Sequence, residues 1–149
     1  MAFIDWTKSD ADATWVLDTT TKRTGTSSVK CSVAPHTTYL YPTTLHVGNC
    51  YVSLYARRTI PTGLAVGTTH DGWGPGGLVT ALPLASTWFH IECYWWYDVG
   101  YDTKFGRVLR DGVQIGADSN FGAGAPAPSD ILLVVGGAPY WIDDVEIWS

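Results

Sequence analysis

The sequence predicts an all-β fold: residues 1–149 form one antiparallel two-sheet β-sandwich, a jelly roll of about ten strands without a substantial helix. Short apolar or alternating segments recur along the chain and are separated by turn residues, which is the pattern of a sandwich. Sixteen Gly and eight Pro supply tight turns, and eight Trp and eight Tyr fit half-buried pleated surfaces. A chain of 149 residues is long enough to bury the core of one domain.

The expected strands in the first half of the chain are short. Residues 1–24 favour extended structure over helix, and residues 25–28 turn the chain into the first alternating strand. The expected strands are 29–33, 39–41, 50–57, 64–66 and 78–82. Between the last two, residues 70–77 form the most glycine-rich loop of the chain.

The longest expected strand covers residues 87–99, and its side chains fall into two alternating sets. The set that should face the core is Phe89, Ile91, Cys93 and Trp95. The set that should face away from the core is Trp88, His90, Glu92, Tyr94 and Trp96.

The strongest local prediction is a hairpin between residues 105–110 and 113–115. The intervening pair, Asp111 and Gly112, predicts a two-residue type I′ turn, because both turn positions need φ above zero. We expect a loop over residues 116–130, which are rich in Gly, Ala and Pro, and then an apolar strand over 131–135.

The chain ends on a hydrophobic strand within residues 139–149, which is expected to close a sheet and to be central in it. Asp143 and Asp144 lie in its middle and point to opposite faces, so they cannot act as a catalytic pair. Strict alternation makes Asp143 the inward carboxylate, on the face of Val145. It also leaves Ile142 outside the core, which indicates a β-bulge at the Asp pair.

Composition argues against two classes of protein. A net charge of −5 with nine scattered Lys and Arg residues gives no basic patch for nucleic acid. No apolar run approaches the roughly 20 residues that a membrane span needs.

The first residues lack the basic and apolar regions of a signal peptide, so the chain is either not exported by the general secretory route or has lost its signal. The three cysteines (Cys31, Cys50 and Cys93) are expected to be buried thiols, with one disulfide as the alternative.

Several motifs, taken in order, resemble the concanavalin A-like (laminin-G-like) jelly rolls and the related β-sandwich carbohydrate-binding modules. Residues 25–30 are similar to the G-x-x-S-L-K strand of these domains, and residues 51–57 to their v-s-f-w-a-r strand. Residues 87–91, 110–116 and 140–147 resemble their W-x-x-v strand, their l-D-G-x-x-i-g hairpin and their closing y-I-D-D-V-x-I strand. The resemblance covers almost the whole chain and implies the fold, whereas functions diverge widely among these domains.

Known catalytic motifs are missing from the sequence. The E-x-D-x-x-E strand of sandwich glycosidases has no counterpart, and neither G-x-S-x-G nor H-E-x-x-H occurs. The four histidines are isolated and lack metal-ligand spacing; they are His36, His46, His70 and His90. We therefore predict that the protein is not an enzyme.

The resemblance implies one structural Ca²⁺, because the closing Asp of the resembled modules often helps to hold a calcium ion. Calcium takes roughly six to eight oxygen ligands, so Asp143 would need partners, for which Asp5 and Asp18 are the candidates. The alternative is that Asp143 or Asp144 accepts backbone N–H bonds at a bend of the strand.

Three aromatic side chains are the candidates for binding a glycan or a protein partner: Trp73 in the glycine-rich loop, Trp96 on the face away from the core, and Tyr101 in a turn. Exposed Trp and Tyr rings can stack on the apolar faces of sugars while their polar atoms stay hydrated. The alternative is that Trp73 folds back over the sandwich edge and that Trp96 packs in a subunit interface.

The leading functional hypothesis is a virion accessory protein, such as a capsid decoration or tail-associated protein, with or without glycan affinity. High aromatic content and low charge favour a protein that buries surface in an assembly. Its partners would be a capsid or other virion protein, copies of itself, or a cell-surface or polymeric glycan, on the virion surface or outside the cell. The alternative is a carbohydrate-binding module of a secreted glycan-active enzyme.

Overall fold

The protein is described by a computed structural model that covers residues 6–8, 15–32, 38–42, 49–59, 63–68, 78–125, 131–135 and 139–148. These residues form thirteen strands and no helix, which confirms the all-β prediction. The strands are β1 (Trp6–Lys8), β2 (Trp15–Asp18), β3 (Ser28–Cys31), β4 (Thr38–Pro42), β5 (Cys50–Arg58), β6 (Gly63–Thr68), β7 (Leu78–Ala81), β8 (Phe89–Asp98), β9 (Thr103–Arg110), β10 (Val113–Gln114), β11 (Ser119–Ala123), β12 (Ile131–Val135) and β13 (Tyr140–Trp148).

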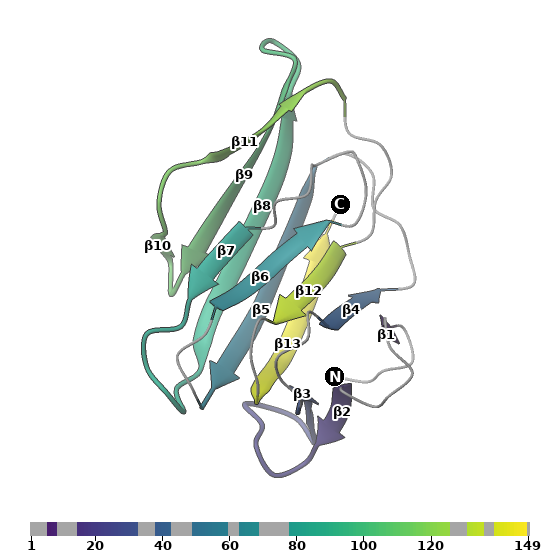
Figure 1. Ribbon diagram of the computed structural model, residues 1–149, viewed down its shortest axis with the longest axis vertical. Helices are drawn as coiled ribbons and strands as arrows, with labels where there is room; N and C mark the ends of the chain where they lie inside the picture. Colours follow the sequence, from purple (N-terminus) through teal and green to yellow (C-terminus); the bar gives the residue numbers. More distant parts are fainter. Residues whose placement is uncertain are drawn as a thin grey trace.

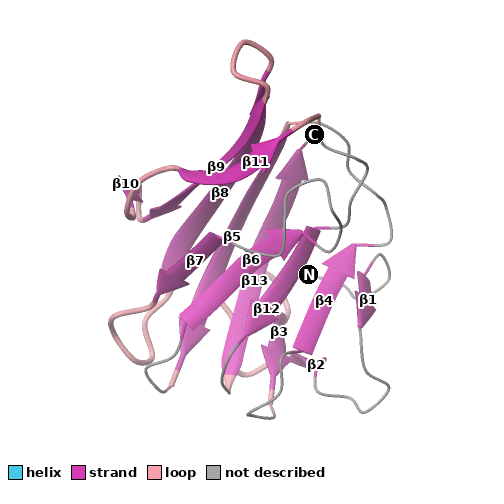
Figure 2. Ribbon diagram, turned by 45° about the horizontal axis from the view of Figure 1, so that its top comes forward, coloured by secondary structure: helices cyan, strands magenta, loops and turns pink. Residues whose placement is uncertain are grey.

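The strands form two antiparallel sheets. The smaller sheet has the order β1-β4-β12-β6-β7, and the larger has the order β10-β9-β8-β5-β13-β3-β2, with β11 paired to β9. Figures 1 and 2 show β6, β7 and β12 lying over β5, β8 and β13, so the sheets form two layers. The last strand, β13, pairs with β5 on one side and β3 on the other, which confirms that it is central.

One strand, β11, was not expected from the sequence, whereas β1 and β2 lie in residues 1–24, for which extended structure was expected without strand bounds. The predicted loop over residues 116–130 is wrong in part, because Ser119 and Asn120 of β11 pair with Gly106 and Phe105 of β9. Small and polar residues carry no strand periodicity of their own, so the pairing here depends on the exposed edge that β9 offers.

The core follows the alternation expected from the sequence. Phe89, Ile91, Cys93 and Trp95 of β8 are buried, whereas the residues between them are half-buried on the other face. Their register partners on β5 that are buried hydrophobics are Cys50, Val52, Leu54 and Ala56. The three cysteines are buried and free, which confirms the expected thiols.

The predicted type I′ hairpin is confirmed. Asp111 and Gly112 have φ of 52° and 77°, and Val113 pairs with Arg110 in register. A backbone in this left-handed region has the same twist as the two flanking strands, so it joins them without splaying the ladder.

The predicted β-bulge in β13 is also confirmed. Asp143 pairs with Tyr55 and Glu146 pairs with Ser53, so β13 has one residue more than β5 between these pairs. Asp144, with φ of 48°, lies in this irregular stretch. The bulge keeps Ile142 in the core, and it corrects the prediction for Asp143: this carboxylate shares the face of Tyr55, which points away from the core.

Candidate functional site

The face of the larger sheet that points away from the smaller sheet, here called the outer face, carries rows of side chains that run across the strands. Directly paired residues on neighbouring strands project from the same face, so the register defines each row. The aromatic row is Trp148, Tyr51 and Tyr94, and it ends at Arg107. The carboxylate row is Glu146, Ser53 and Glu92, and the histidine row is Asp143, Tyr55 and His90.

The aromatic row is a nearly continuous platform of rings. The centroid of Tyr51 lies 4.7 Å from that of Tyr94 and 4.9 Å from that of Trp148. Trp148 is 50% exposed. Beside the row, Trp96 stacks on Phe105 with a centroid distance of 5.7 Å. Partly exposed rings of this kind bury apolar surface when a ligand with an apolar face covers them, while the polar atoms at their edges can stay hydrated.

Two neighbouring hollows open beside these rings. The first has a volume of about 410 Å³ and is lined by Tyr94, Trp96, Arg107, Leu109 and Gln114. The second has a volume of about 280 Å³ and is lined by Asn49, Cys50, Tyr51, Tyr94, Trp95, Trp96 and Trp148. They share Tyr94 and Trp96, so these two side chains form the ridge between them.

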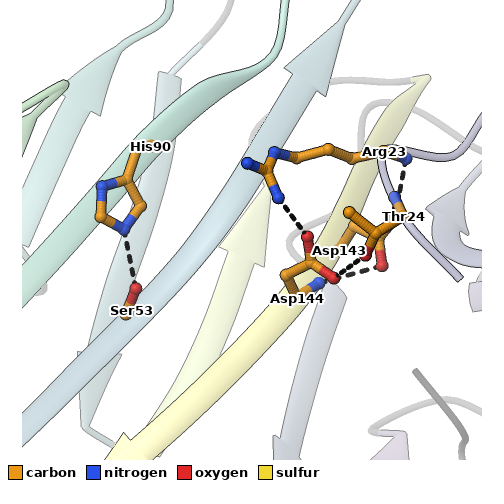
Figure 3. Close-up of polar contacts among 6 residues, drawn as sticks. All are labelled: Arg23, Thr24, Ser53, His90, Asp143 and Asp144. Atoms are coloured by element: carbon orange, nitrogen blue, oxygen red, sulfur yellow. Dashed lines mark hydrogen bonds and ion pairs between the residues drawn. The ribbon is translucent and has the colours of Figure 1, made fainter.

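A polar network occupies the centre of the outer face. The hydroxyls of Tyr51 and Tyr94 donate to Glu92 Oε1 at 3.0 and 3.1 Å. Ser53 Oγ lies 2.8 Å from His90 Nε2, as Figure 3 shows, and His90 Nδ1 lies 3.8 Å from Glu92 Oε2. Burial first, and then the neighbouring Glu92 carboxylate, raise the pKa of Tyr94 to about 12, so this phenol stays a donor at neutral pH.

His90 is therefore not isolated, contrary to the sequence-based interpretation. It is 37 residues from Ser53 in the chain, and only the pairing of β5 with β8 brings the two together. Alternation alone already placed His90, Glu92 and Tyr94 on one face, but the sequence gives no signal for which strand lies beside them.

A second group of contacts lies at the end of the histidine row. Arg23, from the loop between β2 and β3, places its guanidinium 3.4 Å from the centroid of Tyr55, which in turn stacks on His90 at 4.7 Å. Arg23 Nη1 also donates to Asp144 Oδ2 at 2.6 Å, and the hydroxyl of Thr24 donates to the same carboxylate (Figure 3). These contacts join the loop to the bulged stretch of β13.

The predicted calcium ligands are placed as follows. Asp143 is only 1% exposed, and its Oδ2 accepts the backbone N–H groups of Arg23 and Thr24 at 2.9 and 3.3 Å. Asp18 accepts N–H bonds from Thr20 and from the indole of Trp141, at 2.7 Å each.

Calcium binding stays a prediction. Asp5 lies outside the described residues, and those residues contain no group of three His, Cys, Asp or Glu side chains arranged to hold a metal. Thermal melting in calcium and in chelator checks the prediction. A bound ion raises the melting midpoint, and a midpoint that is the same in both would contradict calcium binding.

The predicted aromatic candidates are separated by the structure. Trp96 lies on the outer face, as expected from alternation, between the two hollows. Tyr101, 79% exposed, lies in the turn between β8 and β9, which projects beyond the sheets in Figure 1, and it lines neither hollow. Trp73 lies outside the described residues. Sequence reasoning missed Tyr51, Tyr94 and Trp148 as neighbours of Trp96.

No family model matches the chain, and no curated protein is significantly similar to it. Solved structures share its fold over nearly the whole chain. The "Cellulose induced protein, Cip1" has 17% identity and a TM-score of 0.69, with 100% of this chain and 93% of that chain covered. The chain thus shares the β-sandwich fold of that protein.

Two further neighbours are enzymes. The alginate lyase vAL-1 from Chlorella virus has 9% identity and a TM-score of 0.57, with 96% of this chain and 92% of that chain covered. The catalytic domain of the glycoside hydrolase family 131 protein from Coprinopsis cinerea has 15% identity and a TM-score of 0.51, with 99% and 81% covered. At these identities the likeness concerns the fold.

These neighbours contradict the prediction that the protein is not an enzyme. That prediction rested on missing sequence motifs, yet the same sandwich forms a glycoside hydrolase catalytic domain and alginate lyases. A site on a sheet face is built from different strands, so its residues need not form any local motif.

In the part of the chain that the structure describes, no helix is long and apolar enough to cross a membrane.

Proposed function

We propose that the protein binds a glycan chain on the outer face of its larger sheet, across the strands. The observation that carries the proposal is the aromatic row with the two hollows that share Tyr94 and Trp96. Sugar rings have apolar faces of C–H groups, and partly exposed Tyr and Trp rings are the side chains that stack on them.

The length of the platform supports an oligosaccharide rather than one sugar. From Trp148 on β13 to Arg107 on β9 the row crosses three strand-to-strand steps. At 4.7–4.9 Å for each step, the row is roughly 14 Å long. A chain of several sugars would lie along it, with its rings over Trp148, Tyr51 and Tyr94.

The polar network beside the platform supplies the groups that orient sugar hydroxyls. Glu92 and Glu146 can accept hydrogen bonds from hydroxyls, and bonds to an ionised carboxylate are about twice as strong as neutral ones. Ser53, between the two glutamates, and His90, in the neighbouring row, add a hydroxyl and a ring nitrogen. The glycan-related structural neighbours agree with this assignment.

Binding is tested by affinity electrophoresis and calorimetry against a panel of polysaccharides. Trp96→Ala and Trp148→Ala should each weaken binding about tenfold, the loss of roughly one stacked ring. Tyr101→Ala removes an aromatic side chain that is more exposed than Trp148 and lines neither hollow, so it should leave binding unchanged. Binding that survives the two Trp substitutions but not Tyr101→Ala would move the site to the β8–β9 turn.

A second candidate function is cleavage of the bound glycan. The observation that favours it is His90, which has Ser53 at one ring nitrogen and Glu92 near the other, on the same face as the aromatic row. A histidine between a carboxylate and a second polar group is suited to proton transfer near neutral pH. Release of reducing ends or unsaturated products by wild type but not by His90→Gln would establish cleavage.

Glycan binding of this kind would suit two kinds of protein, a carbohydrate-binding module and a virion accessory protein. A carbohydrate-binding module of a secreted glycan-active protein agrees better with the structural neighbours than a virion accessory protein does. A hydrolase domain encoded beside this chain would support the module, whereas neighbouring capsid or tail genes would support the virion protein.

A further inference from the structure

We infer that the glycan bound on the outer face is uncharged and that chains of uronic acids are excluded. The inference rests on the proposed function and names its substrate class. It comes from the charged side chains that the structure describes on the outer face. The cations near the platform are already in ion pairs, the other cations lie far from it, and the carboxylates beside it have few or no cationic partners.

Among the described residues, Arg107 at the end of the platform and Arg23 beside the histidine row are already paired. Arg107 makes a bidentate ion pair with Asp118, with Nε to Oδ1 and Nη2 to Oδ2 both at 2.7 Å. Arg23 makes an ion pair with Asp144 and stacks on Tyr55. A uronate carboxylate would have to displace one of these internal partners, and the displaced aspartate would be left without its cation.

Two further cations that the structure describes on this face lie far from the platform. Arg57 and Lys30 both pair with Trp141 in register and lie about 5 Å from its ring, with distances of 5.4 and 5.2 Å. Along β5, Arg57 is six residues from Tyr51 of the aromatic row. Six residues of an antiparallel strand span roughly 20 Å, which is more than twice the screening length in physiological salt.

The carboxylates of the carboxylate row, unlike the two arginines, have little or no opposite charge beside them. Among the described residues Glu146 has no ion pair, and Glu92 receives neutral tyrosine hydroxyls in addition to His90. Both lie one row from the rings on which sugars would stack, with Ser53 between them. A neutral sugar can donate its hydroxyls to these carboxylates, whereas a uronate would bring a like charge to each ring.

The test compares neutral and acidic polysaccharides at two ionic strengths. Neutral probes are β-glucan, xylan and galactomannan; acidic probes are alginate and polygalacturonate. We expect the wild-type protein to bind at least one neutral probe with a Kd that changes less than about twofold between about 100 mM and 500 mM salt, since screening acts on charge pairs. We expect no binding of either acidic probe at the lower salt.

A matched variant tests whether the ion pair of Arg107 with Asp118 contributes to the exclusion of uronic acids. Asp118→Asn releases Arg107 from its ion pair without altering a residue that lines either hollow. This variant should gain weak, salt-sensitive binding of alginate and keep its neutral-glycan Kd within about twofold. Wild-type binding of an acidic probe would overturn the inference and leave the proposed function intact. Absence of binding to every probe would overturn the proposed function and the inference with it. An Asp118→Asn variant that gains nothing would overturn the role given to the Arg107 pairing.

Discussion

At the scale of single residues, Asp143 and Asp144 are neighbours with different roles. Asp143 is buried and accepts three backbone N–H groups, from Arg23, Thr24 and Asp144. Asp144 is partly exposed and pairs with the side chains of Arg23 and Thr24. The positive φ of Asp144 separates the two carboxylates, so one ties down the β2–β3 loop by its backbone and the other by its side chains.

The matched substitutions Asp143→Asn and Asp144→Asn should therefore differ. An amide has one acceptor oxygen, so Asp143→Asn leaves buried N–H groups unpaired and should lower the free energy of unfolding by about 2 kcal/mol. Asp144→Asn loses one surface ion pair and should cost less than about 1 kcal/mol. Urea unfolding followed by tryptophan fluorescence measures both; equal costs would contradict the role given to Asp143.

Asp18 gives a pH-dependent prediction. Hydrogen bonds, first from the Thr20 hydroxyl and then from the Trp141 indole, hold its pKa well below its usual value of 3.8. A folded-state pKa below the unfolded one stabilises the protein above the unfolded pKa, and this contribution is lost as the pH falls below it. Asp18→Asn should thus melt at a lower temperature than wild type at pH 7, and the gap should narrow below about pH 3. A gap that is independent of pH would contradict the assignment.

At the scale of elements, the hairpin β9–β10 depends on backbone conformation rather than on packing. A Cβ added at Gly112 would meet no heavy atom within 4 Å, but its φ of 77° is unfavourable for any residue with a side chain. Gly112→Ala should therefore destabilise the protein by about 1–2 kcal/mol through strain alone. Gly100→Ala, at a turn glycine without a positive φ, is the control: its Cβ would meet only the end of the Asp98 side chain, with Oδ1 at 3.3 Å, and it should cost less than about 1 kcal/mol. Thermal melting measures both variants.

At the scale of the whole molecule, the two faces of the larger sheet have separate tasks. The inner face carries the buried cysteines, and burial raises the pKa of the Cys50 thiol to about 11 and that of Cys93 further still. The folded protein should thus react slowly with Ellman's reagent at pH 8, and three thiols should react at once in urea. Rapid reaction of a thiol without denaturant would show that the sandwich opens locally.

The sequence by itself determined the local features of this protein. In β8, period-two alternation assigned every second residue from Phe89 to the core and every second residue from His90 to the other face. The Asp111–Gly112 pair specified its turn. The misfit of Ile142 indicated the bulge. Each of these depends on residues that are close in the chain, where backbone geometry limits the outcomes.

Only the tertiary structure decided the candidate site. Tyr51, Glu92 and Trp148 are 41 and 56 residues apart in the chain, and β5 lies between β8 and β13 because the whole sandwich closes in that order. No local pattern specifies which strands are neighbours or in which register they pair. The same alternation that separated core from surface therefore left the rings, the carboxylates and His90 as unconnected residues until the sheet aligned them in rows.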